Sequence, residues 1–457
     1  MQSAFPQLSP APSPSAGDSA SVWMRTSQGR SHDFGLAEKM HDVASPESRL
    51  TATRREVLRS PNTRRYLIGQ AVSYTGTFAQ GFAQVLLVLR ISDSKSIVPL
   101  VIALQTLPLL LLGSWGGTIA DRLDNRTVLI GTSLASAALA FGLGVLVNTE
   151  RATPSTVIVF SVLLGAVGVF ERPVAQAILS ELVAPHDVGA AVSMNAMLPP
   201  IARLIGPPLA SGLAALAGLA FAFYANALSY LVLIWAMLLV RRSDMFERKK
   251  TTERNGLVRA GFAYARHDPV VGPALVLMFV VGFAAFNFTT VLPLMSKFTF
   301  GLDPKDSRDS GLIALVQTVS AIGSLFAGVL IGWLRKPTLG SQAWAAVVFG
   351  LMLVLFALAP SYWWWAAMAF PVGIAATGFT TLTTTILQTS TKPEMLGRVM
   401  ALFSIAFMGT TPLGAASVAW LSNVFSPRAP FVVGGVMTAM GGVLLLTRSR
   451  RAVAVAM

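Results

Sequence analysis

From Tyr66 onward, apolar stretches of roughly 18–25 residues recur along the chain, separated by short polar connections. An α-helix of that length crosses a hydrocarbon core of ~30 Å. Only 12% of the residues are charged, whereas soluble domains carry about 25%. We therefore expect an all-α integral membrane protein with twelve spans, near 65–89, 97–119, 127–147, 155–179, 192–215, 219–240, 270–296, 311–334, 342–359, 362–388, 398–421 and 429–447.

Lysine and arginine indicate which way each connection faces. If the N-terminus is cytoplasmic, the cytoplasmic connections from Arg54 onward hold 22 basic residues and the opposite connections hold 7. This asymmetry favours cytoplasmic termini in a multi-pass protein of the cell inner (plasma) membrane. Loops beside anionic lipid then explain the net charge of +14, so the lipid bilayer is an expected partner and nucleic acid is not.

The connections also divide the chain into segments. We predict a disordered cytoplasmic tail over 1–60, a six-helix half over 61–241, a basic cytoplasmic central loop over 242–268, a second six-helix half over 269–449 and a short cytoplasmic tail over 450–457. GTIADRLDNRT at 117–127 aligns with GVLIGWLRKPT at 328–338, and PHDVGAAVSM at 185–194 aligns with PEMLGRVMAL at 393–402. Because both matches lie in equivalent places, two six-helix pseudo-repeats are predicted.

The connection after the second predicted span carries GTIADRLDNR. It resembles the signature of the major facilitator superfamily, Gly-x-x-x-Asp-Arg-x-Gly-Arg-Arg/Lys, and the matching residues are Gly117, Asp121, Arg122 and Arg126. Asp124 and Asn125 depart from the pattern, which leaves open the inter-helix pairing made at the place of Asn125. The resemblance implies the major facilitator fold, with this loop as a conformational latch, and a monomer is expected.

A second motif is RLIGPPLASG at 203–212. It resembles the Gly-Pro motif that is typical of exporters in the same superfamily, and the preceding PVAQAILSELVAPHDVGAAVSMNA is similar to the branch of enterobactin and macrolide exporters. Prolines remove backbone donors and kink a helix, while glycines permit close helix contacts. The motif residues are Gly206, Pro207, Pro208 and Gly212, and a purely structural kink is an alternative reading of them.

Three charged residues lie well inside the predicted spans, away from the span ends, namely Glu171, Arg172 and Arg203. Such charges are expensive in a membrane and often functional. Neighbouring helical residues point ~100° apart, so Glu171 and Arg172 are poorly placed to neutralise each other. We predict that Glu171 pairs with Arg203, which lies at a similar depth in the next span, and that Arg172 faces a substrate cavity. Glu171 is also the candidate for proton coupling, with a purely structural salt bridge as the alternative.

Polar residues at helical spacing predict the rest of the cavity. The first span carries five of them on one face, and the fourth, seventh, eighth and tenth spans carry others. The bland alternative is that these side chains only hold helices together. The predicted cavity residues, besides Arg172, are Gln70, Ser73, Thr77, Gln80, Gln176, Asn287, Gln317, Thr381 and Thr384.

These features together predict a secondary active transporter rather than an enzyme. We expect it to export a small organic molecule by alternating access, with an anion such as a siderophore favoured by Arg172. No Gly-x-x-x-x-Gly-Lys-Ser/Thr motif occurs, so proton antiport is the expected energy source. The alternatives are a polyspecific drug efflux pump and a solute importer of the same fold. The chain has no cysteine and its four histidines lie in polar segments, so neither a metal site nor a cofactor is expected.

Overall fold

The computed structural model describes residues 57–246, 257–332 and 337–456, and it leaves undescribed the side chains of 114–122, 257–259, 329, 331–332 and 448–456. The predicted tail over 1–60, apart from 57–60, and part of the predicted central loop therefore lie outside the described residues. All regular structure assigned within the described ranges is helical. Eleven described helical segments, two of them interrupted, are long and apolar enough to cross a membrane, and α3 adds a shorter apolar segment over Ile97–Gly113. The predicted all-α membrane fold is confirmed.

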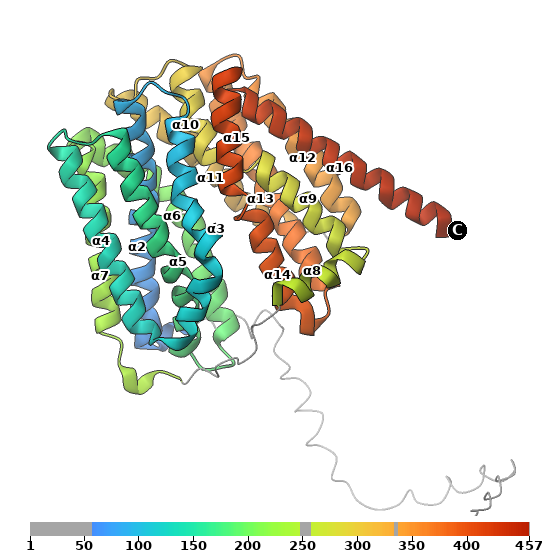
Figure 1. Ribbon diagram of the computed structural model, residues 1–457, viewed down its shortest axis with the longest axis horizontal. Coiled ribbons are helices and arrows are strands. Elements are labelled where there is room, and N and C mark those ends of the chain that lie inside the picture. Colours follow the sequence, from blue (N-terminus) through green and yellow to red (C-terminus); the bar gives the residue numbers. More distant parts are fainter. Residues whose placement is uncertain (1–56, 247–256, 333–336, 457) are drawn as a thin grey trace, which may run out of the picture. The chain divides into compact units, whose positions relative to one another are not determined.

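The first six spans are single helices (Figure 1), and each begins and ends close to its predicted boundary. Ser60, Asp124 and Thr153 cap α2, α4 and α5 by accepting a backbone hydrogen bond, as N-cap side chains do. Helix α6 continues through four internal prolines. The helices are α2 (Pro61–Ile91), α3 (Ile97–Arg122), α4 (Asn125–Asn148), α5 (Pro154–Leu182), α6 (Val188–Leu216) and α7 (Ala220–Leu238).

The second half differs because two of its spans are interrupted. The seventh span consists of α9 (Val271–Ala284) and α10 (Phe288–Phe298), and the eleventh of α14 (Pro393–Phe407) and α15 (Thr411–Val424). The two breaks adjoin, because a Cβ on Gly282 would lie 2.6 Å from the Ala406 carbonyl oxygen and one on Gly414 would lie 2.8 Å from the Phe283 oxygen. The other spans are α11 (Ser307–Gly332), α12 (Leu339–Ala357), α13 (Tyr362–Ser390) and α16 (Ala429–Ala456).

The central connection holds one element that the sequence did not predict. Helix α8 (Leu257–His267) lies within the predicted loop and packs on α9 and α14. A Cβ on Gly261 would lie 3.1 Å from the Arg398 Cβ, so α8 and α14 approach closely. Helix α16 likewise runs through Ala456, into the segment that we predicted as a short tail.

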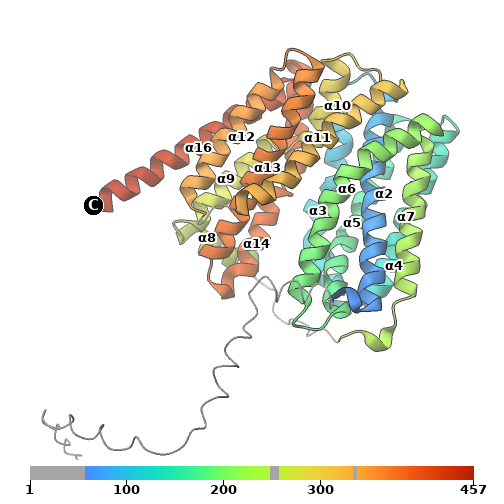
Figure 2. The same cartoon turned by 180° about the vertical axis from the view of Figure 1, so that it is seen from behind.

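Neighbours in sequence are not always neighbours in space (Figures 1 and 2). Helix α5 packs mainly on α3 and α4, whereas α6 packs mainly on α2 and, across the two halves, on α11. In the second half, α11 packs on α13 and α12 packs on α16. This arrangement decides which polar side chains can meet.

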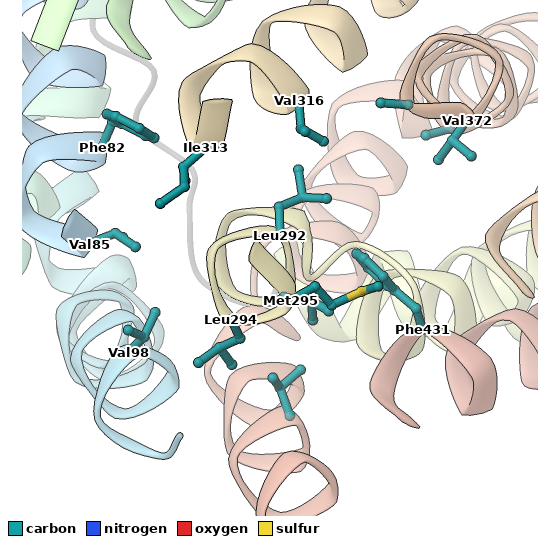
Figure 3. Packing of buried hydrophobic residues seen from close by; sticks show 14 of the residues in the cluster. Phe82, Val85, Val98, Leu292, Leu294, Met295, Ile313, Val316, Val372 and Phe431 are labelled. Atoms are coloured by element: carbon teal, nitrogen blue, oxygen red, sulfur yellow. The ribbon is translucent and has the colours of Figure 1, made fainter. Parts of the chain in front are cut away.

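Among the described side chains, the hydrophobic core joins the two halves at one end. We call the end where α2 begins and α7 ends the terminal side, and the end where α2 meets α3 the far side. One buried cluster includes residues of both halves and reaches the far side (Figure 3): Phe82 and Val98 belong to it together with Leu292, Leu294 and Ile313. Two further clusters lie toward the terminal side, one in each half. The halves therefore share apolar packing on the far side.

Candidate functional site

Arg172 lies on the accessible inner face of α5. Its side chain is exposed, while Val159 and Leu163 form the exposed apolar part of the same helix. Leu163 precedes Arg172 by nine residues, or ~180° around the helix, so Arg172 points away from the side that suits lipid. Gln176 is also exposed, one turn further along. The structure therefore brings these two predicted cavity residues together on one face.

Arg203 is likewise exposed on α6, on the side away from the apolar stripe. Ile201, Ile205 and Leu209 form an exposed apolar stripe on that helix, and Arg203 lies ~160° from the centre of this stripe. Its guanidinium carbon is 5.6 Å from the centre of the Phe78 ring on α2. Cation–π contact of this kind holds a guanidinium without neutralising it.

Glu171 does not pair with Arg203 in this structure. Its carboxylate accepts a hydrogen bond from Ser136 on α4, and Arg172 is the charged group nearby. Among the described residues, no ion pair joins Glu171 to either arginine. The predicted Glu171–Arg203 pair is therefore not formed, because α5 packs on α3 and α4 while α6 packs on α2.

A polar network surrounds Glu171 inside the first half. The Thr77 and Tyr230 hydroxyls are 3.1 Å apart and share a hydrogen bond, and Tyr230 also interacts with Glu171. Asn226 donates to Gln80 Oε1 at 2.8 Å. The helices α2, α4, α5 and α7 thus meet through hydrogen bonds around the half-buried carboxylate of Glu171.

The polar stripe of the first span is mostly buried rather than exposed to a cavity. Gln70, Ser73, Gln80 and Gln84 are only 2–3% exposed, and Gln84 donates to the Ser161 hydroxyl on α5 at 2.7 Å. The prediction that Gln70, Ser73 and Gln80 line the cavity is wrong for this conformation; the stripe joins α2 to its neighbours. Of the predicted cavity residues on this first span, only Thr77 is exposed, and it bonds to Tyr230.

Four of the predicted cavity residues belong to the second half: one of them is buried and three are partly accessible. Asn287 is 4% exposed and donates to the Phe283 carbonyl oxygen at 2.9 Å, so it stabilises the break between α9 and α10 instead of lining a cavity. Gln317, Thr381 and Thr384 are half-buried. Gln317 lies ~160–200° from exposed Leu315 and Phe326 on α11, which suits an inward face.

The latch motif is described only in its last part, because the side chains of Gly117, Asp121 and Arg122 lie outside the described residues. Arg126 donates to the Met237 and Leu238 carbonyl oxygens, both at 3.0 Å. These carbonyls end α7, where a cation is favoured by the helix dipole. Arg126 therefore ties the start of α4 to the end of α7.

Asp124 and Asn125, the two residues that differ from the motif, both bond to other elements of the structure. The Asn125 amide donates to the Glu181 carboxylate of α5 at 2.5 Å, so a neutral donor makes the pairing that the sequence left open. Asp124 accepts from the Thr127 hydroxyl and pairs with Arg242 at 3.0 Å. The Thr127 hydrogen bond, with help from Arg242, lowers the pKa of Asp124.

The Gly-Pro motif is a close-packing device at one of its two glycines. A Cβ on Gly206 would lie 2.7 Å from the Phe78 Cβ and 2.8 Å from the Ala79 nitrogen, so α6 can approach α2 this closely only with glycine. Gly212 has open space around it. Together with Pro208, Gly212 lines a hollow of about 330 Å³ between α6 and α11, and Pro207 is buried.

Sequence reasoning missed a set of contacts that joins the halves on the far side. Lys297, at the end of α10, donates to the Leu89 oxygen at 2.6 Å, the Ser92 oxygen at 3.2 Å and Asp93 Oδ1 at 2.7 Å. This interaction lowers the pKa of Asp93. The only available signal was a lysine directly after an apolar span.

Three other residues extend these contacts. Arg90 donates to the Pro304 carbonyl oxygen at 2.6 Å, and Asn423 donates to Ser96. Each hydrogen bond or ion pair that is recorded between described side chains and the opposite half lies on this far side. The described conformation is therefore closed there.

Known proteins resemble this chain over most of its length. A family model described as "Transmembrane secretion effector" matches residues 56–453. The staphyloferrin A transporter of Staphylococcus aureus is 24% identical over 346 residues, which cover 73% of this chain and 83% of that protein. Macrolide efflux protein A of Streptococcus pyogenes is 22% identical over 367 residues, covering 79% and 88%. The enterobactin exporter EntS of Salmonella choleraesuis is 25% identical over 336 residues, covering 72% and 78%.

Solved structures of transporters share the fold. The nucleoside transporter NupG superposes with a TM-score of 0.67 at 11% identity, covering 84% of this chain and 98% of NupG. The peptide transporter POT in complex with sulfate gives a TM-score of 0.66 at 14% identity, covering 87% and 98%. At such low identities these likenesses establish the fold alone.

Proposed function

Because the chain belongs to the transmembrane secretion effector family of the major facilitator superfamily, and is thus a transporter rather than an enzyme, we propose that it exports a small organic anion. In this proposal the terminal side faces the cytoplasm and the membrane is the plasma (inner) membrane. The evidence for a negatively charged substrate is Arg172. Its guanidinium is exposed on the inner face of α5 and has no ion-pair partner among the described residues. A cation in that position attracts anions and repels cations.

The relatives support export of a small organic molecule without fixing the substrate. Two of them are named for staphyloferrin A and enterobactin, and another for macrolide efflux. A polyspecific drug pump would use aromatic side chains, but Phe286 and Phe288 pack against Phe349 of the core, and Phe379 is fully buried. The anion exporter is therefore the first choice, and the drug pump the second.

The proposed mechanism is alternating access between two six-helix halves. The described conformation is joined on the far side by the shared apolar cluster and by Lys297 and Arg90. An exporter in this state would load substrate from the cytoplasm. Breaking the far-side contacts and forming contacts at the terminal side would then release the substrate outside.

Glu171 is the candidate residue for energy coupling by proton antiport. This residue is the acidic side chain at the centre of the polar network of the first half, next to Arg172. Proton antiport requires that Glu171 gives up its proton when the substrate binds and regains it after release. Antiport is therefore tested by whether protonation of Glu171 weakens or strengthens substrate binding.

The experiment compares efflux by wild type, Arg172→Ala and Glu171→Gln at matched membrane expression, with anionic siderophores and cationic drugs as substrates. Arg172→Ala is expected to lose anion export by at least about tenfold, since a charged hydrogen bond contributes about 1.5–3 kcal/mol. Arg151→Gln, in the exposed connection after α4, is the matched control. Unchanged anion export in Arg172→Ala would reject the proposal and move the drug pump to first place.

Direction needs its own measurement, because an importer would share the fold. Inside-out and right-side-out vesicles present opposite faces to the same labelled anion. Export predicts accumulation in energised inside-out vesicles. Accumulation in right-side-out vesicles alone would identify an importer.

A further inference from the structure

Two arginines from different helices lie along one face of α2. Tyr74 and Phe78 are four residues apart on that helix, so they share a face at successive turns, ~6 Å apart along the axis. Arg203 of α6 lies over the Phe78 ring. Arg172 of α5 lies within electrostatic reach of the Tyr74 hydroxyl. Because α2 packs on both α5 and α6, the two arginines approach successive residues of this face, Arg172 near Tyr74 and Arg203 at Phe78.

Both arginines are accessible and neither is neutralised by an ion pair. Their side chains are exposed, on the faces of α5 and α6 that point away from the exposed apolar stripes. The described residues record no ion pair for either of them. Glu171 is the one carboxylate within the described spans near them, so the group keeps a positive charge even when Glu171 is ionised. Uncompensated charges inside a membrane bundle are costly and mark ligand sites.

We propose that Arg172 and Arg203 form a two-point site for an organic dianion, with Tyr74 and Phe78 supporting the body of the ligand. The inference rests on the proposed function and names its substrate class: an organic molecule with two acidic groups, one for each guanidinium, on an apolar or aromatic scaffold. Guanidinium groups bind carboxylates bidentately and stack on aromatic rings. Arg203, predicted from sequence as a structural partner, becomes a specificity residue.

The test compares ligands that differ only in charge. Purified wild-type protein is titrated by calorimetry with isophthalate, benzoate and dimethyl isophthalate, which carry two, one and no carboxylates. We expect isophthalate to bind at least about tenfold more tightly than benzoate, because it gains a second charged hydrogen-bond pair. The diester is expected to bind more weakly than either.

Variants then assign the second carboxylate to Arg203. Arg203→Gln is expected to weaken isophthalate about 10- to 100-fold, to the level of benzoate, and to change benzoate by less than about threefold because Arg172 remains. Arg203→Lys should recover part of the loss, since a lysine keeps the positive charge but cannot bind a carboxylate through two parallel hydrogen bonds. Arg151→Gln, an exposed arginine, should change neither ligand.

Two results would overturn the inference. One is a wild-type ratio of isophthalate to benzoate affinity close to one, which needs no variant and holds even if Arg203→Gln fails to fold. The other is an equal loss of both ligands in a folded Arg203→Gln protein. Anion export that depends on Arg172 together with a ratio of one would overturn this site alone. Anion export independent of Arg172 would overturn the proposed function itself.

Discussion

Replacing Lys297 by methionine should open the far side of the protein. The ammonium group donates to the Leu89 and Ser92 carbonyl oxygens at 2.6 and 3.2 Å, which belong to the end of α2 and lack intrahelical partners. Since the Lys297 side chain is 17% exposed, each bond is worth about 1–1.5 kcal/mol rather than the full value of a charged hydrogen bond. Methionine keeps the apolar stem and removes the charge. The closed state should therefore lose about 2–3 kcal/mol, a shift of about 30- to 150-fold in the equilibrium.

The assay is the distance between spin labels across the far side in lipid nanodiscs. The chain has no cysteine, so cysteines placed at Ser94 and Arg308, both exposed, carry the only labels. Lys297→Met should raise the population at long distance, while Lys305→Met, an exposed lysine in the next connection, should not. Distance distributions that superimpose for Lys297→Met and wild type would refute the reasoning.

Three further outcomes follow from the same contacts. Arg90→Gln should shift the same distance distribution in the same direction, because it removes the 2.6 Å bond to the Pro304 oxygen, and no shift would contradict that role. Gly206→Val should lower stability by about 1–3 kcal/mol through overpacking against α2, measured by thermal unfolding with Gly212→Ala as the control that changes little; equal effects would contradict the packing argument. The hydrogen bond and charge of Lys297 lower the pKa of Asp93, so this pair is present above the ordinary aspartate pKa of about 3.9 and is lost as pH falls through the lowered value. The far-side distance should thus stay constant from about pH 8 to 5, and a transition near pH 6 would identify another titrating group.

Hydropathy predicted the spans because each must be apolar over the thickness of a membrane, but it did not predict the interruptions. Residues 282–288 read GFAAFNF, which is as apolar as the flanking helix and contains no proline. The break depends on tertiary packing, because Gly282 faces the Ala406 carbonyl and Gly414 lies against Phe283 and Asn287; the local hydrogen bond from Asn287 to Phe283 adds to it. No local pattern in one span reveals that a second break lies beside it.

The sequence allowed a prediction of how deep Glu171 and Arg203 lie along their helices. It did not allow a prediction of which side chains they contact. Counting residues from the turn placed Glu171 and Arg203 at similar levels, and the pairing then assumed that consecutive helices pack along their length. In the structure α2 lies against α6 instead, so Arg203 meets Phe78. The same limit explains the polar stripe of α2: its spacing identified one face, while only packing determined that Gln80 and Gln84 would bond α7 and α5.

The charges around Arg172 also constrain how transport could be powered. An ionised Glu171 beside Arg172 offsets part of the positive charge that attracts an anion, and a protonated Glu171 does not. By reciprocity of linked binding, protonation of Glu171 then strengthens anion binding, and bound anion strengthens proton binding. Antiport needs the opposite sign, because the two ligands must exclude each other.

The affinity for isophthalate measured as a function of pH decides between these two couplings. Electrostatics predicts that affinity rises as pH falls in wild type and that Glu171→Gln, which carries no titrating carboxyl there, holds the high-affinity value at every pH. That result would rule out proton antiport through Glu171 and leave the membrane potential as the driving force, since moving one charge across 100 mV yields about 2.3 kcal/mol and a dianion gains twice as much on leaving a negative interior. An affinity that falls with falling pH in wild type, and that does not change with pH in Glu171→Gln, would restore antiport and contradict the charge argument. Tyr74, Tyr66 and Tyr230 interact with Glu171 as well, but their hydroxyls stay neutral over the range tested, so the carboxyl alone sets the sign.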